Sequence, residues 1–206
     1  QYDLDYKISP NFGLDVPMEQ ISKGNGGSCV LSAYSSSVIN LSSHFTTSLG
    51  ITAQYFPLNK NWTVEPRAAL KWSFNPKHAL ALAYGLHSRR EKLDYYFVEQ
   101  EANGKTESNR YLDFSKAHHF GLTYDWNINS YMHLKVEPYY QYLFRIPVEE
   151  NSSFSIINHQ SFYLDRILKN RGSGVNYGID ITLEQYMKNG FYYMITASLF
   201  KSKYKA

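Results

Sequence analysis

The stretch MHLKVEPYYQYLFRI, from Met132 to Ile146, decides the fold of this chain. Its residues alternate between two sets. The even set is Met132, Leu134, Val136, Pro138, Tyr140, Tyr142, Phe144 and Ile146, and the odd set is His133, Lys135, Glu137, Tyr139, Gln141, Leu143 and Arg145. Successive side chains of a β-strand point to opposite faces, so the pattern predicts one strand with an apolar and a charged face. The alternation is longer than the roughly five or six residues of an ordinary strand and exceeds the roughly nine to eleven that cross a bilayer.

The same alternation recurs along the rest of the chain. The predicted strands cover residues 2–8, 28–38, 44–57, 62–74, 78–90, 117–127, 132–147, 175–187 and 191–204. Between them, clusters of glycine and proline predict turns or loops at 10–17, 23–27, 103–104 and 171–174. We therefore expect an all-β chain, folded as an antiparallel up-and-down meander of about eight strands between residues 28 and 204.

The connections between these strands fall into two alternating sets that differ in length. One set is short, at 39–43, 75–77, 127–131 and 188–190, and the interleaved set, at 57–61, 91–116 and 148–174, contains two long segments. Alternate connections of a meander lie at the same end of the sheet. Short turns at one end and long loops at the other are typical of a transmembrane outer-membrane β-barrel, with periplasmic turns and extracellular loops.

Charge also separates the two faces. The polar face carries Glu65, Arg67, Lys71, Asp125, Lys135, Glu137, Arg145, Asp180 and Glu184, whereas the middle of the other face is nearly free of charge. An Arg or Lys facing lipid near the bilayer midplane costs about 2–4 kcal/mol, so the charged face is expected to line the lumen. On that face, Lys135 and Glu137 are expected to pair with charges of neighbouring strands, such as Asp125 or Glu184.

Composition excludes several other classes of protein. The net charge of +3 is spread along the chain without a dense basic patch, which argues against nucleic-acid binding. A run of eighteen apolar residues is absent, which excludes a transmembrane helix. Cys29 is the only cysteine, so an internal disulfide or a cysteine metal site is excluded. The first residues lack the features of a signal peptide, so either a signal was removed or the chain begins inside a larger protein.

Several strand segments, in order, resemble the C-terminal barrel of TonB-dependent outer-membrane receptors of the Bacteroidetes type. They are HALALAYGLHSR at 78–89, LDFSKAHHFGLTYDW at 112–126, HLKVEPYYQYLFRIPV at 133–148, NYGIDITLEQYM at 176–187 and FYYMITASLFKSKY at 191–204. The resemblance covers roughly residues 30–206. It implies a protein of the bacterial outer membrane that imports a scarce or bulky nutrient, such as a ferric chelate, a vitamin, an oligosaccharide or a peptide.

Members of that family are longer than this chain. They carry an N-terminal plug domain, a box that contacts the TonB complex and a barrel of about twenty-two strands. Neither the plug nor the box is recognisable here, so residues 1–206 are expected to form a single partial barrel segment. The partners that the resemblance implies are outer-membrane lipid, the missing plug and strands, the TonB complex through the plug region, and a surface lipoprotein. The resemblance implies no cofactor.

Candidate ligand-binding residues lie where strand 78–90 meets the first long loop. His87, Arg89 and Arg90 suit an anionic ligand such as a ferric chelate or a carboxylate, although ordinary lumen and rim charge is the alternative. Tyr95, Tyr96 and Phe97 suit stacking on a sugar or chelate, and loop packing is the alternative.

Other residues give no catalytic or metal signature. His118 and His119 are adjacent in a strand and are expected to point to opposite faces, so they cannot share a metal. The acidic residues of the 91–116 loop fit no calcium-loop spacing. A nucleophile elbow or an ordered triad is absent, which argues against an enzyme.

Two other functional interpretations remain open from the sequence. A stand-alone small outer-membrane barrel would close the eight strands on themselves. A soluble β-sandwich that serves as a binding or adhesion domain would pack them as two sheets.

Overall fold

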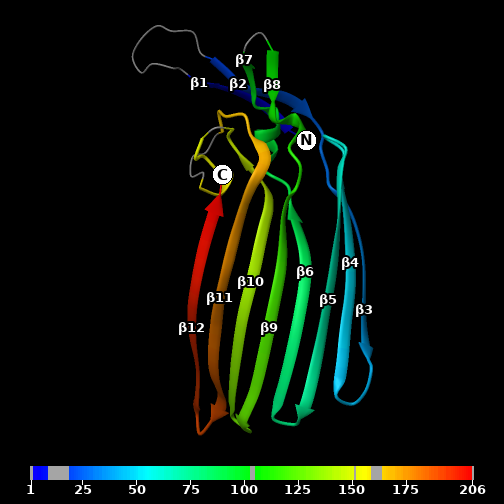
Figure 1. The fold of residues 1–206 in the computed structure, drawn as a ribbon, viewed down its shortest axis with the longest axis vertical. Helices are drawn as coiled ribbons and strands as arrows, with labels where there is room; N and C mark the ends of the chain where they lie inside the picture. Colours follow the sequence, from blue (N-terminus) through cyan, green and yellow to red (C-terminus); the bar gives the residue numbers. More distant parts are fainter. Residues whose placement is uncertain (1, 9–18, 103–104, 151, 159–163, 206) are drawn as a thin grey trace.

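The computed structural model describes residues 2–8, 19–102, 105–150, 152–158 and 164–205. Its main feature is one antiparallel sheet of eight strands in the order β12-β11-β10-β9-β6-β5-β4-β3 (Figure 1). The strands are β3 (Leu31–Asn40), β4 (Phe45–Phe56), β5 (Asn61–Asn75), β6 (His78–Arg89), β9 (Ser115–Asn129), β10 (Met132–Val148), β11 (Lys169–Lys188) and β12 (Phe191–Lys205). Each strand pairs with its neighbour along the chain once β7 and β8 are set aside, so the predicted meander is confirmed.

The strand β10 occupies the position in the sheet that the sequence predicts. It pairs antiparallel with β9 and with β11, and Tyr140 lies opposite both Phe120 and Tyr177. The described main-sheet strands form one sheet and not two packed layers, which disagrees with the soluble-sandwich alternative. Within this sheet β3 and β12 each have a partner on one side only, so the described strands do not close on themselves as a stand-alone small barrel would.

The ends of the sheet differ as the connection lengths predict. The four short turns lie together at the lower end in Figure 1, and the long connections lie together at the upper end. Two small hairpin sheets also lie at the upper end: β1 (Tyr2–Ile8) pairs with β2 (Glu19–Gly26), and β7 (Glu99–Ala102) pairs with β8 (Lys105–Ser108). The predicted loop at 10–17 and the predicted turn at 103–104 lie outside the described residues.

Two predicted glycine turns are wrong, because both segments are strands. Residues 23–26 belong to β2, and residues 171–174 belong to β11, which begins at Lys169 and not at residue 175. A Cβ on Gly24 would lie 2.5 Å from the Phe97 ring, and a Cβ on Gly174 would overlap Tyr204. These glycines therefore mark close approach of a neighbouring side chain within a strand.

One face of the sheet, which we call the apolar face, carries exposed aliphatic side chains between two aromatic rows. Leu82 and Leu199 are 58% and 71% exposed. The upper aromatic row, across β6, β9, β10 and β11, is Tyr84, Phe120, Tyr140 and Tyr177. Near the short turns, Phe74, Tyr124 and Trp126 surround His78 with nearly parallel rings. Apolar surface bounded by aromatic girdles is the arrangement of a lipid-facing barrel wall.

The opposite face, the polar face, pairs some of its charges differently from the prediction. Lys135 bonds to Glu137 of its own strand, with Nζ 2.8 Å from Oε1, and Asp125 bonds to His133 at 3.0 Å. The predicted cross-strand pairing of Lys135 and Glu137 is therefore wrong. Two residues apart on a strand, side chains share one face about 7 Å apart, within reach of a flexible lysine.

A folded cap covers the upper end of the sheet, built mainly from the two long connections. The buried cluster is Ile21, Phe56, Tyr95, Tyr96, Phe97, Val98, Leu112, Phe114, Leu164 and Leu168. The cap also contains three short 3-10 turns, η1 (Leu93–Phe97), η2 (Asn109–Tyr111) and η3 (Ile156–Asn158). None of the helical segments in the described part of the chain has the length and apolar character needed to span a membrane.

Two asparagines join the halves of the cap. Asn109, which is 1% exposed, donates from Nδ2 to the Arg166 carbonyl at 2.8 Å and accepts at Oδ1 from the Leu168 N–H at 2.7 Å. Asn170 accepts from the Asp113 N–H at 2.8 Å and donates to the Arg145 carbonyl at 2.8 Å. These bonds connect the 91–116 segment to the 148–174 segment and to the top of β10.

A bulge near the top of β10 turns Arg145 toward the cap. The register of β10 against β11 shifts between Leu143 and Ile146, and Arg145 has a φ of 54°. Its Nη1 lies 2.5 Å from Asp113 Oδ2. The strict alternation that the sequence predicts for Arg145 therefore ends at this bulge, because an extra residue in one strand breaks the period of two.

Candidate functional site

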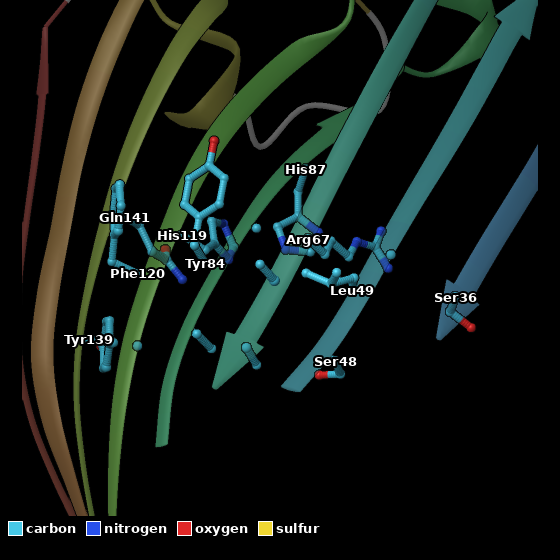
Figure 2. A pocket seen from close by; sticks show the side chains of 16 residues that line it. Ser36, Ser48, Leu49, Arg67, Tyr84, His87, His119, Phe120, Tyr139 and Gln141 are labelled. Atoms are coloured by element: carbon cyan, nitrogen blue, oxygen red, sulfur yellow. The ribbon is translucent and has the colours of Figure 1, made fainter. Parts of the chain in front are cut away.

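A cavity of about 500 Å³ lies on the polar face, and Figure 2 shows the side chains that line it. Two neighbouring lateral rows line it. The upper inner row is Gly50, Arg67, Gly85, His119 and Gln141, and the lower inner row is Ser48, Ala69, Ala83, Gly121 and Tyr139. Small residues in the centre of both rows leave the space, and polar side chains surround it.

Gly85 provides room for the His87 ring. A Cβ added to Gly85 would lie 2.8 Å from His87 Nε2 and 3.6 Å from Arg67 Cγ. Because the side chain of Gly85 is absent, the imidazole of His87 folds back along its own strand toward the row of Arg67. There it meets His119 of β9, with the two ring centroids 4.5 Å apart and the rings tilted by 44°.

A buried carboxylate bonds to Arg67 of the cavity lining. Glu65 is only 2% exposed, and three side chains donate to its carboxylate. Gln54 Nε2 and Ser88 Oγ donate to Oε1 at 2.8 and 2.6 Å, and Arg67 Nη2 donates to Oε2 at 3.0 Å. A buried charge needs this degree of pairing to be tolerated. The bond to Glu65 orients the half-exposed guanidinium of Arg67 at the cavity.

The far wall comes from Tyr139 and Gln141 of β10. Asn176 Nδ2 donates to Gln141 Oε1 at 3.2 Å, which holds the Gln141 amide. Figure 2 shows Arg67, His87 and His119 gathered at one level of the cavity, with Tyr139 and Gln141 on the neighbouring strand. One guanidinium, two imidazoles, an amide and a phenol can bind an anionic or chelating ligand by charge-assisted and neutral hydrogen bonds.

The structure divides the first group of predicted ligand residues. His87 lines the cavity, but Arg89 and Arg90 do not. The Arg89 side chain is 81% exposed and lies 3.7 Å from Glu91 Oε2. Arg90 lies over the Phe56 ring, 5.8 Å from its centroid, and donates to the Glu91 carbonyl at 3.3 Å. Both arginines thus belong to the junction of β6 with the cap.

The second predicted group, Tyr95, Tyr96 and Phe97, lies in the cap core with exposures of 4%, 1% and 8%. Tyr96 packs edge-on against Phe56, with centroids 5.2 Å apart, and its hydroxyl accepts the Glu91 N–H at 3.2 Å. Burial raises the pKa of Tyr96 to about 12 and also raises the pKa of Tyr95. Loop packing, the alternative left open by the sequence, describes these contacts, and ligand binding by the three aromatics stays a prediction.

Sequence reasoning missed most residues of the cavity. From the sequence, Arg67 is assigned to the polar face but not to a site, and His119 is considered only as a metal ligand. The prediction that His118 and His119 point to opposite faces is confirmed, since His118 stacks on Phe144 of the apolar face, 5.0 Å between centroids. The pairing of His119 with His87 depends on the β6–β9 register. In the described part of the chain, no cluster of three or more His, Cys, Asp or Glu residues is arranged to hold a metal ion.

Fold and faces together define an antiparallel meander of the outer-membrane barrel type, and solved structures agree. The chain is similar to the FrpB iron transporter from Neisseria meningitidis, F3-3 variant, at 12% identity and a TM-score of 0.61, covering 85% of this chain and 26% of that one. It is also similar to the siderophore receptor PirA from Pseudomonas aeruginosa, at 10% identity and a TM-score of 0.64, covering 84% and 34%. The chain thus spans between a quarter and about a third of these structures. No protein-family model and no curated protein matches the sequence.

Proposed function

We propose that this chain is the barrel segment of a TonB-dependent outer-membrane receptor that imports a scarce or bulky nutrient. The observation that carries the proposal is the separation of faces across eight long strands. One face exposes large apolar side chains between aromatic rows, and the other holds charged and polar side chains around a cavity. Lipid on the first side and a wet or plug-filled lumen on the second account for both.

The rest of the receptor belongs to the same proposal. A plug domain and further strands of the parent protein would complete the barrel against the edges of β3 and β12, and the plug region would engage the TonB complex. A surface lipoprotein partner and the Bacteroidetes type of receptor are further parts of the proposal, supported by the resemblance of the strand segments.

A ferric chelate is the ligand class to test first, ahead of a vitamin, an oligosaccharide or a peptide. The matched structures are an iron transporter and a siderophore receptor, although the likeness itself concerns the fold. The cavity offers Arg67, His87 and His119 to an anionic chelate, and the cap stands at the end where ligand would enter. Arg89, Arg90 and the Tyr95–Phe97 aromatics stay proposed contacts at that entrance.

Uptake by the full-length parent protein tests the proposal. A strain lacking the gene, complemented with the intact gene, is expected to take up radiolabelled iron from ferric chelates, and Arg67→Gln is expected to lower uptake about tenfold or more, from loss of a charge-assisted contact and of the Glu65 partner. The control is Lys71→Gln, which removes a positive charge from the same strand face two rows below, outside the cavity lining. Uptake of every tested nutrient class without the gene, at the rate seen with it, would exclude an import function.

A further inference from the structure

Three lysines follow one another at every second position near the upper end of β12. The register sets Lys201 opposite Tyr177, Lys203 opposite Val175 and Lys205 opposite Ser173. Tyr177 and Val175 belong to the apolar face, because they continue the rows of Tyr140 and Tyr142. The lysines therefore project from the apolar face, about 7 Å apart along the strand, and all of β12 is exposed.

Their height on the sheet coincides with the upper part of the aromatic band, which includes Tyr142 and Phe144 of β10. Lys201 continues the upper aromatic row, and Lys203 and Lys205 lie one and two rows above it. Lys116 of β9 lies on the same face at this height, opposite Phe144, which stacks on His118 of the apolar face. Two strands, β10 and β11, lie between Lys116 and β12. The three inter-strand spacings amount to about 14 Å. We call these four residues the lysine patch.

The lysine patch is an excess of positive charge and not one half of a set of ion pairs. No ion pair among the described residues includes any of its four members. Arg145 and Arg171, at the same end of the sheet, are neutralised by Asp113 and Glu150. A membrane surface beside the patch therefore meets ammonium groups without competing carboxylates on β12.

We propose that the lysine patch binds the phosphate groups of lipids in the outer leaflet, an inference that rests on the proposed outer-membrane function. Tyr140 and Tyr142 of the apolar face continue the rows of Lys201 and Lys203, and Phe144 lies opposite Lys116. Aromatic side chains gather at the water boundary of a bilayer, so the lysine patch lies at that boundary, next to the lipid phosphates. Lysine suits this position, because its aliphatic stem lies along apolar surface while the ammonium reaches the headgroup. A pair of phosphates on one large headgroup would engage β12 and Lys116 together.

A competing explanation is protection of a sheet edge. Lysines on an edge strand prevent association with another sheet, and β12 is an edge of the described sheet. Edge protection requires only positive charge and is indifferent to the chemistry of the lipid. Phosphate recognition requires that removal of the lipid phosphates has the same effect as removal of the lysines. The two explanations therefore differ in a measurable way.

The test uses the full-length parent protein purified in a zwitterionic detergent. Native mass spectrometry measures binding of a diphosphorylated diglucosamine lipid, of the same lipid without phosphates, and of inorganic phosphate. The variant is Lys201→Gln with Lys203→Gln and Lys205→Gln. The matched control is Lys71→Gln with Lys77→Gln and Lys188→Gln, which removes the same charge from the polar face and from the end with short turns.

The variant is expected to bind the phosphorylated lipid about a hundredfold more weakly at low salt, from about fivefold for each lysine near a membrane surface. The control is expected to bind the phosphorylated lipid as tightly as the unchanged protein does. In 1 M salt, most of the difference in affinity between the variant and the unchanged protein should disappear. Equal binding of the two lipids, equal losses in variant and control, saturation by inorganic phosphate alone, or aggregation of the variant with unchanged lipid binding would each overturn the proposal. Cysteine labelling of β10 in the full-length protein in membranes reports separately whether the sheet lies in a bilayer, and thus tests the proposed function.

Discussion

Tyr96 is a central residue of the cap core, because both its ring and its hydroxyl make contacts there. The ring packs edge-on against Phe56, and the hydroxyl accepts the backbone N–H of Glu91, which is the residue that follows the strand β6 by two positions. One side chain thus connects the first long connection to the ends of β4 and β6. Its loss should affect the cap without affecting the lower sheet.

The burial of Tyr96 makes the cap sensitive to alkali. Its pKa in the folded cap is about 12, above the ordinary value of 10.0. Below pH 10 the group is neutral in both states. Between pH 10 and 12 the unfolded chain releases the proton and the folded cap keeps it, so stability falls as pH rises, by about 2–3 kcal/mol.

Tyr96→Phe is expected to lower stability by about 1–3 kcal/mol at pH 8, since the Glu91 N–H loses its partner. The difference in the free energy of unfolding between the unchanged protein and the variant should then narrow from pH 10 to 12. Urea unfolding at successive pH values measures this difference. Tyr111→Phe, at a residue 80% exposed, is the control and should show no such narrowing. A gap that stays constant to pH 12 would contradict the assigned burial.

The structural role of a glycine is difficult to predict from the sequence at the scale of single residues. Gly24, Gly85 and Gly174 have the local appearance of turn residues or of neutral strand positions. In the structure each makes room for a ring from elsewhere: Phe97, His87 and Tyr204. The ring that needs the space lies in the turn η1 for Gly24, on β12 for Gly174 and two residues along the same strand for Gly85, so a single sequence does not reveal it.

At the scale of elements, the alternation within each strand was predictable and the register between strands was not. The strand predicted at 132–147 is β10, Met132–Val148, because a period of two is a local property. The cavity depends instead on lateral rows, which place Arg67 opposite Gly85 and Gly85 opposite His119. These rows arise from turn geometry and bulges, so His87 was the one predicted site residue that lines the cavity.

Single cysteines placed along β10 from 133 to 142 test the assignment of faces. The parent protein in membranes is expected to react with a lipid-soluble probe at even positions, which lie on the apolar face with Leu134 and Val136. A water-soluble reagent should favour the odd positions, with Lys135 and Glu137, when no plug fills the lumen. Protection of the even positions from both reagents would instead indicate a protein core. If neither reagent showed alternation along the strand, the barrel assignment would be contradicted.

At the scale of the whole molecule, the structure has two parts, the sheet and the cap, which different interactions stabilise. The sheet depends on ladders of backbone hydrogen bonds and on what surrounds its apolar face. The cap has a buried core of its own, in which Phe56 of β4 meets side chains from both long connections. The sequence predicted long loops at this end and not a folded cap, because the core residues of the cap come from segments far apart in the chain.

Asn109 is expected to decide whether that cap stays closed. Its buried amide satisfies the Arg166 carbonyl and the Leu168 N–H, so Asn109→Ala leaves two backbone groups without partners in the core. Each buried group left unsatisfied costs about 1–3 kcal/mol. The two long connections should then separate, and limited proteolysis of the membrane-embedded parent protein should cleave between residues 91 and 116 or between 148 and 168 at least tenfold faster than in the unchanged protein.

The matched control for this prediction is Asn129→Ala at the opposite end of the sheet. Asn129 also accepts two backbone N–H groups, from Tyr131 and Met132, but in an exposed turn where water can replace its oxygen. Cleavage of the cap in that variant should match the unchanged protein. If Asn109→Ala left the cleavage rate unchanged, the amide bridge would not hold the connections together. First cleavage at residues 75–77 or 188–190 in the unchanged protein, on the outside of intact cells, would place the short turns and not the cap outside the cell.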